Sequence, residues 1–213
     1  MNARTPLALA ALAVLAAAPV APAFAQEAGP TPLALGATMP LATVKLKNVD
    51  GKEITLASQK GAKGTLVVFT CNACPWAKKW EGRVAAIGND ALKRGLGVVA
   101  INANDPGKNP EDGYGVMQAR AKDRDMKFAY AVDGTSDVAR AFGASRTPEA
   151  FLFDASGKLV YHGTIDDNAD DAAKVTKPYL QDAVVAVAAG KTVPTATTKA
   201  LGCGIKFRAK SAS

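Results

Sequence analysis

The sequence predicts an α/β domain with a central mixed β-sheet flanked by helices, an N-terminal β-hairpin extension and a C-terminal tail. Two continuous apolar runs, TLVVFT at 65–70 and LGVVAIN at 96–102, are typical of strands buried on both faces of a sheet. Between them, 75–94 repeats apolar side chains at helical spacing, so strand, helix and strand predict a right-handed βαβ unit. A later hairpin adds antiparallel strands.

Turn and capping signals predict the remaining elements. Asp50-Gly51 marks the turn of the N-terminal hairpin. The polar loop at 103–115 follows the second buried strand, at the sheet edge where α/β folds place their sites. The other expected elements are a helix at 114–124, a strand at 127–133, a short helix within 134–144 with Thr135 or Ser136 as N-cap, strands at 149–154 and 158–165, and a closing helix at 177–190 with Pro178 in its first turn.

The first 25 residues have the layout of a secretory signal peptide. Arg4 precedes an apolar run at 7–20, and the small residues Ala23 and Ala25 indicate cleavage after Ala25. The apolar run is shorter than the roughly 20 residues that a membrane-spanning helix needs. We therefore expect residues 1–25 to be removed and the protein to be exported, with the periplasm as its compartment.

After the signal peptide we expect a flexible lead-in at 26–35, one domain at 36–191 and a tail at 192–213 that carries Cys203. The formal net charge of +7 is spread along the chain without a dense basic cluster or a nucleic-acid motif, which indicates a solvated surface rather than nucleic-acid binding. No later apolar run reaches membrane length. No haem, flavin or nicotinamide motif is visible, so we predict no cofactor.

Cys71 and Cys74 flank an Asn-Ala dipeptide where the first buried strand meets its helix. A disulfide between them would close a very small loop and would add little chain-entropy stabilisation. Free N–H groups and the positive dipole end in the first helical turn stabilise a thiolate, and such a site can lower a thiol pKa from about 8.5 to between about 3.5 and 7.5. The spacing therefore predicts a reactive dithiol, with Cys71 as nucleophile and Cys74 as resolving thiol.

Several separated motifs carry a family resemblance. FTCNACPWAKKWE, INANDP, TPEAFLFD, VYHGTIDDN and LGCGIKF resemble, in this order, the peroxiredoxin-like (AhpC/TSA-type) branch of the thioredoxin/redoxin family over most of residues 36–208. The resemblance implies a thioredoxin fold and a thiol–disulfide oxidoreductase whose partners are thiol or disulfide proteins, small thiols or peroxides. It also places Thr147-Pro148 at the family's cis-proline loop, which faces the dithiol and helps to bind a partner's extended chain.

The same resemblance also implies a role for the third cysteine, Cys203. A C-terminal Gly-Cys followed by Ile-Lys recurs in the family, which implies that the tail packs back near the site and that Cys203 can exchange with the dithiol. The alternative is a buried or idle thiol. With three cysteines in an oxidising compartment, at least one thiol is free, transiently paired or paired between molecules.

Two departures from the family shape the expected site. Arg146 stands where relatives often carry a cysteine, and its guanidinium could hold the Cys71 thiolate or an acidic group of the substrate. Thioredoxins bury an acidic residue on the strand that leads to the dithiol, whereas this chain has Val67 and Val68 there. Asp105 in the adjoining loop is then the candidate for proton transfer from Cys74.

Trp76 has two interpretations. It could flank the exposed sulfur and contact substrate, or it could belong to the core-facing stripe of its helix.

Two other functions compete with the oxidoreductase hypothesis. A thiol peroxidase would need one reactive cysteine, but peroxiredoxins place Thr or Ser three residues before it, where Val68 stands here. A metal protein could use Cys71, Cys74, Cys203 and His162 as a Cys₃His zinc site, or the pair plus histidine for copper. His162 lies inside a predicted strand, where a histidine is more often structural, so we predict no metal site.

Overall fold

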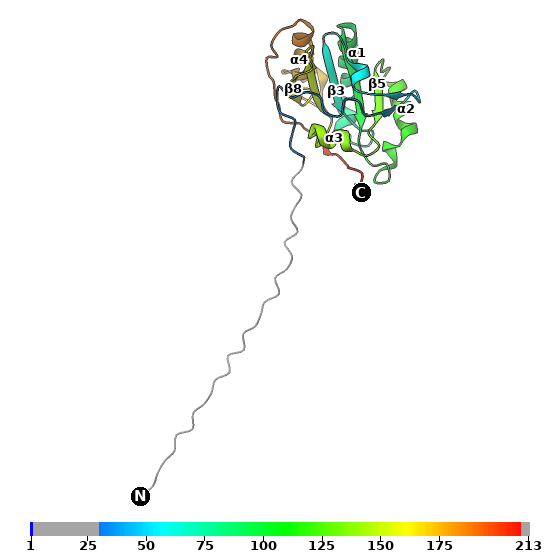
Figure 1. Ribbon diagram of the computed structural model, residues 1–213, viewed down its shortest axis with the longest axis vertical. Helices are drawn as coiled ribbons and strands as arrows, with labels where there is room; N and C mark the ends of the chain where they lie inside the picture. The colour runs from blue at the N-terminus through cyan, green and yellow to red at the C-terminus, as the bar shows by residue number, and fades with distance from the viewer. Residues whose placement is uncertain (2–29, 210–213) are drawn as a thin grey trace.

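The computed structural model describes Met1 and residues 30–209 (Figure 1). The expected signal peptide, apart from Met1, and the lead-in up to residue 29 lie outside the described residues. From Thr31 the chain is packed on the domain: Thr31 and Pro32 contact Gly143, and Leu33 N donates to Phe142 O over 3.0 Å. No helix within the described part of the chain is long and apolar enough to cross a membrane.

The core of the fold is a seven-stranded mixed sheet with the order β2-β1-β5-β4-β3-β7-β8. β3, β4 and β5 are parallel, and every other neighbouring pair is antiparallel. The predicted βαβ unit and both hairpins are therefore present. The strands are β1 (Leu46–Asn48), β2 (Glu53–Ile54), β3 (Gly64–Phe69), β4 (Leu96–Asn102), β5 (Ala129–Val132), β7 (Glu149–Asp154) and β8 (Leu159–Gly163).

Helices cover both faces of this sheet (Figure 1). One face packs on α1 (Pro75–Lys93), α2 (Tyr114–Asp123) and α4 (Tyr179–Ala188), and the other packs on the short α3 (Asp137–Phe142). The pleat of β3 explains how one apolar run serves both layers: Leu66 and Val68 join the first cluster, whereas Val67 and Phe69 join the second. Single 3₁₀ turns are η1 (Ala57–Gln59), η2 (Pro110–Asp112) and η3 (Ala172–Lys174).

Two predicted helix starts differ in detail. Ser136 is the N-cap residue of α3, as one of the two candidates, but its side chain does not cap the helix. Ser136 Oγ donates to Ala103 O, Thr135 Oγ1 accepts from Asp137 N over 3.3 Å, and the Ala139 N–H is satisfied by Asp133 Oδ2. Pro178 is the residue before α4 rather than part of its first turn, because its backbone has a non-helical ψ of 62°. Both differences reflect tertiary contacts or backbone angles that local spacing does not specify.

The C-terminal tail returns to the domain instead of leaving it. Its strand β9 (Cys203–Gly204) pairs antiparallel with β6 (Arg146–Thr147) in a separate two-stranded sheet. Beyond β9, Ile205 is buried in the α3 cluster and the Arg140 guanidinium donates to Arg208 O. In Figure 1 this red segment passes next to α3.

The layer under α3 depends on a cluster of aromatic rings. Phe142 lies edge-on to Phe69, Phe151 and Phe153, with centroid distances of 5.2, 5.3 and 5.9 Å, and all four rings are fully buried. Such pairs add to the free energy gained by burying the ring area. Phe142 thus joins α3 to β3 and β7.

Replacing Phe142 with alanine should lower the free energy of unfolding by about 3–5 kcal/mol, because it opens a cavity in this cluster. Urea denaturation would measure the loss. Val185→Ala on α4 is the control, since the side chain of Val185 is 39% exposed and its truncation should cost less than about 0.5 kcal/mol. Equal losses for the two variants would contradict a central role for Phe142.

Candidate active site

The two cysteines lie in the connection between β3 and α1. Cys74 is the N-cap residue of α1 and Pro75 is the first helical residue, which suits a ring that lacks an N–H. Both side chains are buried, with exposed fractions of 5% for Cys71 and 4% for Cys74, and both are thiols. The strand and helix expected from the sequence therefore bring the dithiol to a buried helix N-terminus.

Thr147 contacts both sulfurs from the facing loop. Its Oγ1 lies 3.1 Å from Cys71 Sγ, and its carbonyl oxygen accepts a hydrogen bond from Cys74 Sγ over 3.2 Å. The Thr147-Pro148 peptide bond is cis, as the resemblance implied. The loop before β7 and the loop before α1 thus meet at this threonine.

The two thiols titrate as a pair. Their mutual hydrogen bond lowers the pKa for loss of the first proton and, together with burial, raises the pKa for loss of the second. Loss of the first proton therefore leaves one negative charge on the pair.

Thr147 determines which sulfur carries that charge. Its carbonyl oxygen can only accept a hydrogen bond, so it favours the protonated thiol at Cys74. Its hydroxyl can donate to Cys71, and this contact opposes the rise in the Cys71 pKa that Cys74 and burial cause. A thiolate at Cys74 would face the carbonyl oxygen with no proton between them. The contacts thus favour a thiolate at Cys71 and a thiol at Cys74.

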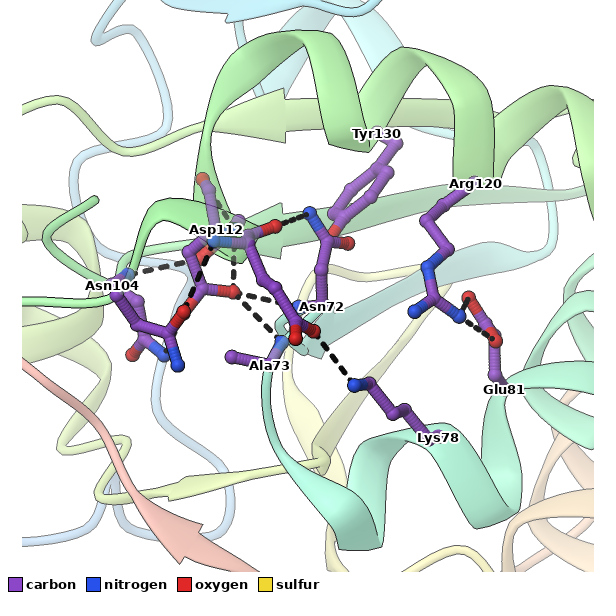
Figure 2. A network of polar contacts seen from close by, with 11 residues as sticks. Asn72, Ala73, Lys78, Glu81, Asn104, Asp112, Arg120 and Tyr130 are labelled. Carbon is purple, nitrogen blue, oxygen red and sulfur yellow. Dashed lines mark hydrogen bonds and ion pairs between the residues drawn. The ribbon is translucent and has the colours of Figure 1, made fainter.

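A buried carboxylate, Asp112, holds the loop between the cysteines (Figure 2). Its Oδ1 accepts from Asn72 N over 2.7 Å and from Ala73 N over 3.2 Å, and its Oδ2 accepts from Asn104 Nδ2 over 2.9 Å. Asp112 is 3% exposed and its charge raises the pKa of Cys71. It therefore fixes the loop geometry and opposes ionisation of Cys71.

The side chain of Asn72 is anchored on the opposite side. Tyr130 on β5 donates its hydroxyl hydrogen to Asn72 Oδ1 over 2.9 Å, and Asn72 Nδ2 donates to Glu111 O (Figure 2). Burial raises the pKa of Tyr130, which keeps the phenol as a donor. The residue between the cysteines is thus part of the support of the loop rather than a free surface side chain.

Among the described residues, no hydrogen bond joins Asp105 to Cys74, so its expected role in proton transfer stays a prediction. Its Oδ1 accepts from Gly107 N over 2.9 Å, and its own N–H donates to Lys206 O in the tail, so it stabilises its local turn. The carboxylate at the dithiol loop is Asp112. Both lie in the polar loop that the sequence marked, together with Glu111, but local spacing does not tell which of the three turns inward.

Arg146 also differs from its expected contact. Its guanidinium donates to Gly202 O over 3.2 Å, and among the described residues no hydrogen bond joins it to Cys71. The side chain is exposed at the edge of β6 and remains accessible to a substrate.

Glu149, which sequence analysis did not single out, is buried next to the cis-proline. Its Oε2 accepts from Ser145 N over 2.8 Å and from Arg146 N over 2.9 Å. Its Oε1 lies 2.6 Å from His162 Nε2. The residue after the Thr-Pro pair is acidic and directly precedes four apolar residues of the same strand, a signal that could have found it.

His162 is engaged by this carboxylate and stacks on Phe151 at a centroid distance of 4.5 Å. Within the described part of the chain, no group of three or more His, Cys, Asp or Glu side chains is placed to hold a metal ion. The Cys₃His set is therefore not assembled here.

Trp76 lies at the rim of the site. It is 38% exposed and stacks on the fully buried Trp80 at 5.9 Å, with Lys79 Nζ 5.1 Å from its ring. Trp80 in turn donates Nε1–H to Asp166 over 2.7 Å. Of the two tryptophans in the predicted stripe, Trp80 is therefore a core residue, whereas Trp76 reaches the surface beside the dithiol.

Cys203 lies against the dithiol. In the register of β6 and β9 it is paired with Thr147, and its side chain packs against the cluster of Cys71, Cys74 and Ala77. It is only partly buried and is a thiol. Burial raises the pKa of Cys203, and its contact with Cys74 adds to the shift.

Comparison with known proteins places this site in a family. The profile of the AhpC/TSA family matches residues 35–162, which include both cysteines of the dithiol and the Thr-Pro loop. The chain belongs to the AhpC/TSA family. The resemblance to this branch of the thioredoxin/redoxin family is therefore confirmed. Membership of the family indicates oxidoreductase chemistry in general.

Solved structures of other proteins share the fold of this chain. A hypothetical protein from Sinorhizobium meliloti 1021 is 36% identical with a TM-score of 0.77, covering 84% of this chain and 98% of the other. An uncharacterized conserved protein from Geobacillus kaustophilus is 34% identical with a TM-score of 0.76, covering 82% and 93%. Peroxidoxin BcpB from Mycobacterium tuberculosis, at 15% identity, a TM-score of 0.54 and coverage of 73% and 96%, shares the fold. No curated protein matches the chain.

Thr147→Val should raise the pH at which the reduced dithiol forms its thiolate, because valine keeps the carbonyl contact to Cys74 but cannot donate to Cys71. Ultraviolet absorbance of the thiolate during a pH titration measures this midpoint, and Cys71→Ser and Cys74→Ser identify the sulfur. A midpoint that does not change in Thr147→Val would place the charge on Cys74 instead.

Asp112→Ala should lower the free energy of unfolding by at least about 3 kcal/mol, because three buried N–H donors lose a charged acceptor. Asp112→Asn retains one acceptor oxygen and should lose less. Removing the charge should also lower the pKa of Cys71 in the Asn variant. Chemical denaturation and thiolate titration check both effects, and wild-type stability in Asp112→Ala would rule out the anchoring role.

Proposed function

We propose that this protein is an exported thiol–disulfide oxidoreductase in which Cys71 and Cys74 form the redox pair. The observation that carries the proposal is the contact of both sulfurs with Thr147, at the cis-proline loop beside a helix N-terminus. Membership of the AhpC/TSA family supports thiol chemistry in general. Partner proteins with thiols or disulfides, or small thiols, are the proposed substrates.

In the proposed reaction, Cys71 thiolate attacks one sulfur of a partner disulfide. A mixed disulfide forms, and the other partner sulfur leaves with the electron pair. Cys74 then attacks Cys71, its proton goes to the departing partner sulfur, and a Cys71–Cys74 disulfide remains. Two thiols are oxidised while one partner disulfide is reduced to two thiols, and the reverse sequence would donate a disulfide.

Groups around the sulfurs suit this reaction. Thr147 Oγ1 can donate to Cys71 while it carries charge, and Trp76 offers an exposed ring at the rim. We assign Thr147, Pro148 and Trp76 to partner binding. Arg146, exposed on β6, is assigned to an acidic group of the partner.

Thiol peroxidase activity is the alternative outcome. It has weaker support, because Val68, three residues before Cys71, is a buried side chain of β3 and supplies no hydroxyl group.

Wild-type protein equilibrated with glutathione redox buffers should form a reversible Cys71–Cys74 disulfide, as judged by thiol alkylation and mass spectrometry. Cys71→Ser and Cys74→Ser should each abolish reduction of a disulfide-containing peptide, whereas Leu201→Ala, with a side chain 40% exposed in the tail, should not. Cysteines that stay inert across all buffers would refute the proposal, and rapid oxidation by hydrogen peroxide alone would favour the peroxidase.

Export has its own test. Cleavage after Ala25 would give a mature protein that begins at Gln26, which intact-mass measurement of protein from a periplasmic extract would detect. Retention of Met1 in the cytoplasmic fraction would contradict export and leave the dithiol chemistry unaffected.

A further inference from the structure

The three thiols are not equally accessible. Cys71 and Cys74 are 5% and 4% exposed, so direct attack of Cys71 on a partner disulfide requires the loops around the pair to open. Cys203 is only partly buried and packs against the pair. The sulfur nearest the solvent is therefore the one in the tail.

β9 holds Cys203 at a defined position. In its antiparallel register Cys203 lies opposite Thr147, the residue that contacts both other sulfurs. Cys74 interacts with Cys71 and with Cys203, so it is the middle sulfur of three.

The tail cannot move freely away from this position. Ile205 is 7% exposed and its N–H donates to Ser145 O, while Lys206 N donates to Asn104 Oδ1 over 2.8 Å. At Gly202 the two backbones approach so closely that an added Cβ would lie 2.1 Å from Thr147 O. The close approach requires glycine and keeps Cys203 against the dithiol.

From this arrangement we propose that Cys203 is a third catalytic thiol, which exchanges with external disulfides at the surface and passes the disulfide inward through Cys74 to Cys71. The proposal rests on the proposed function and specifies how a buried pair reaches its partners. In this relay β9 carries a reacting thiol, whereas the alternative is that β9 only shields the dithiol from solvent.

The relay balances at each step. Cys203 thiolate attacks a partner disulfide, forms a mixed disulfide and releases one partner thiolate. Cys74 attacks the Cys203 sulfur, so a Cys74–Cys203 bond forms and the second partner thiolate leaves. Cys71 thiolate then attacks Cys74, giving Cys71–Cys74 and restoring Cys203. The two protons given up by Cys71 and Cys74 end on the two partner thiols.

Proximity makes the inner steps feasible. Burial raises the pKa of Cys203, so its thiolate is the minor form at neutral pH. Once the mixed disulfide has formed, however, both later attacks are intramolecular between side chains already in contact, and such steps gain a large effective concentration.

Oxidation of the reduced protein by oxidised glutathione tests the relay. The rate of Cys71–Cys74 formation, followed by acid quenching, alkylation and mass spectrometry, should fall at least about tenfold in Cys203→Ser. Gly202→Ala keeps the thiol but forces β9 off Thr147, and should slow the reaction similarly. Leu201→Ala is the matched control in the tail and should react at the wild-type rate.

A second variant traps the intermediate. In Cys71→Ser the relay stops at Cys74, so oxidation should yield a monomer with an intramolecular Cys74–Cys203 disulfide, and Gly202→Ala in the same background should reduce its yield. Circular dichroism of each variant confirms that the fold is retained.

The outcomes separate the two proposals. A wild-type rate in Cys203→Ser, or faster oxidation in Cys203→Ser and Gly202→Ala, would overturn the relay and make the tail a cover, while a Cys71–Cys74 couple would still stand. Only intermolecular products in Cys71→Ser would also overturn it. Wild-type protein that forms no disulfide at all would overturn the proposed function and the relay together.

Discussion

The site depends on one residue, Thr147, that uses three of its groups at once. Its hydroxyl contacts Cys71, its carbonyl oxygen accepts from Cys74, and its backbone pairs with the strand that carries Cys203. A single shift of this loop would therefore change the environment of all three sulfurs together. Because a hydroxyl can donate and a carbonyl cannot, the same residue also gives the two buried thiols different preferred protonation states.

Two buried carboxylates hold the loops that meet at Thr147. Asp112 accepts from the backbone between the cysteines, and Glu149 accepts from Ser145 and Arg146 just before the cis-proline. Each satisfies N–H groups that the local backbone leaves unpaired, and each is nearly inaccessible to water. The sheet beneath supplies the spacing, since β3 and β7 are adjacent and in register from Gly64 to Phe69. Precise placement of the sulfurs thus comes from paired polar groups on a rigid apolar base.

The periodicity of apolar residues was sufficient to predict the main strands and helices of the sheet. The runs that became β3 and β4, the stripe of α1 and the turn signals of both hairpins are local patterns, so they could be predicted within one or two residues. The dithiol also followed from local spacing, and the positions of Thr147 and Cys203 followed from family resemblance. Asp112 and Glu149 could not be assigned, because their roles depend on which way a loop turns and on partners far away in sequence. For the same reason, the side-chain contacts of Arg146 and Asp105 could not be assigned from the sequence.

The stacked tryptophans have a further consequence. Trp76 and Trp80 are the two tryptophans of the chain, and they lie together on the first two turns of α1, whose N-cap residue is Cys74. All indole emission from this protein therefore originates on the helix that starts at the dithiol. Since thiolates and disulfides quench excited indoles at short range to different extents, the chain carries an intrinsic optical reporter of its own oxidation state, with no attached dye.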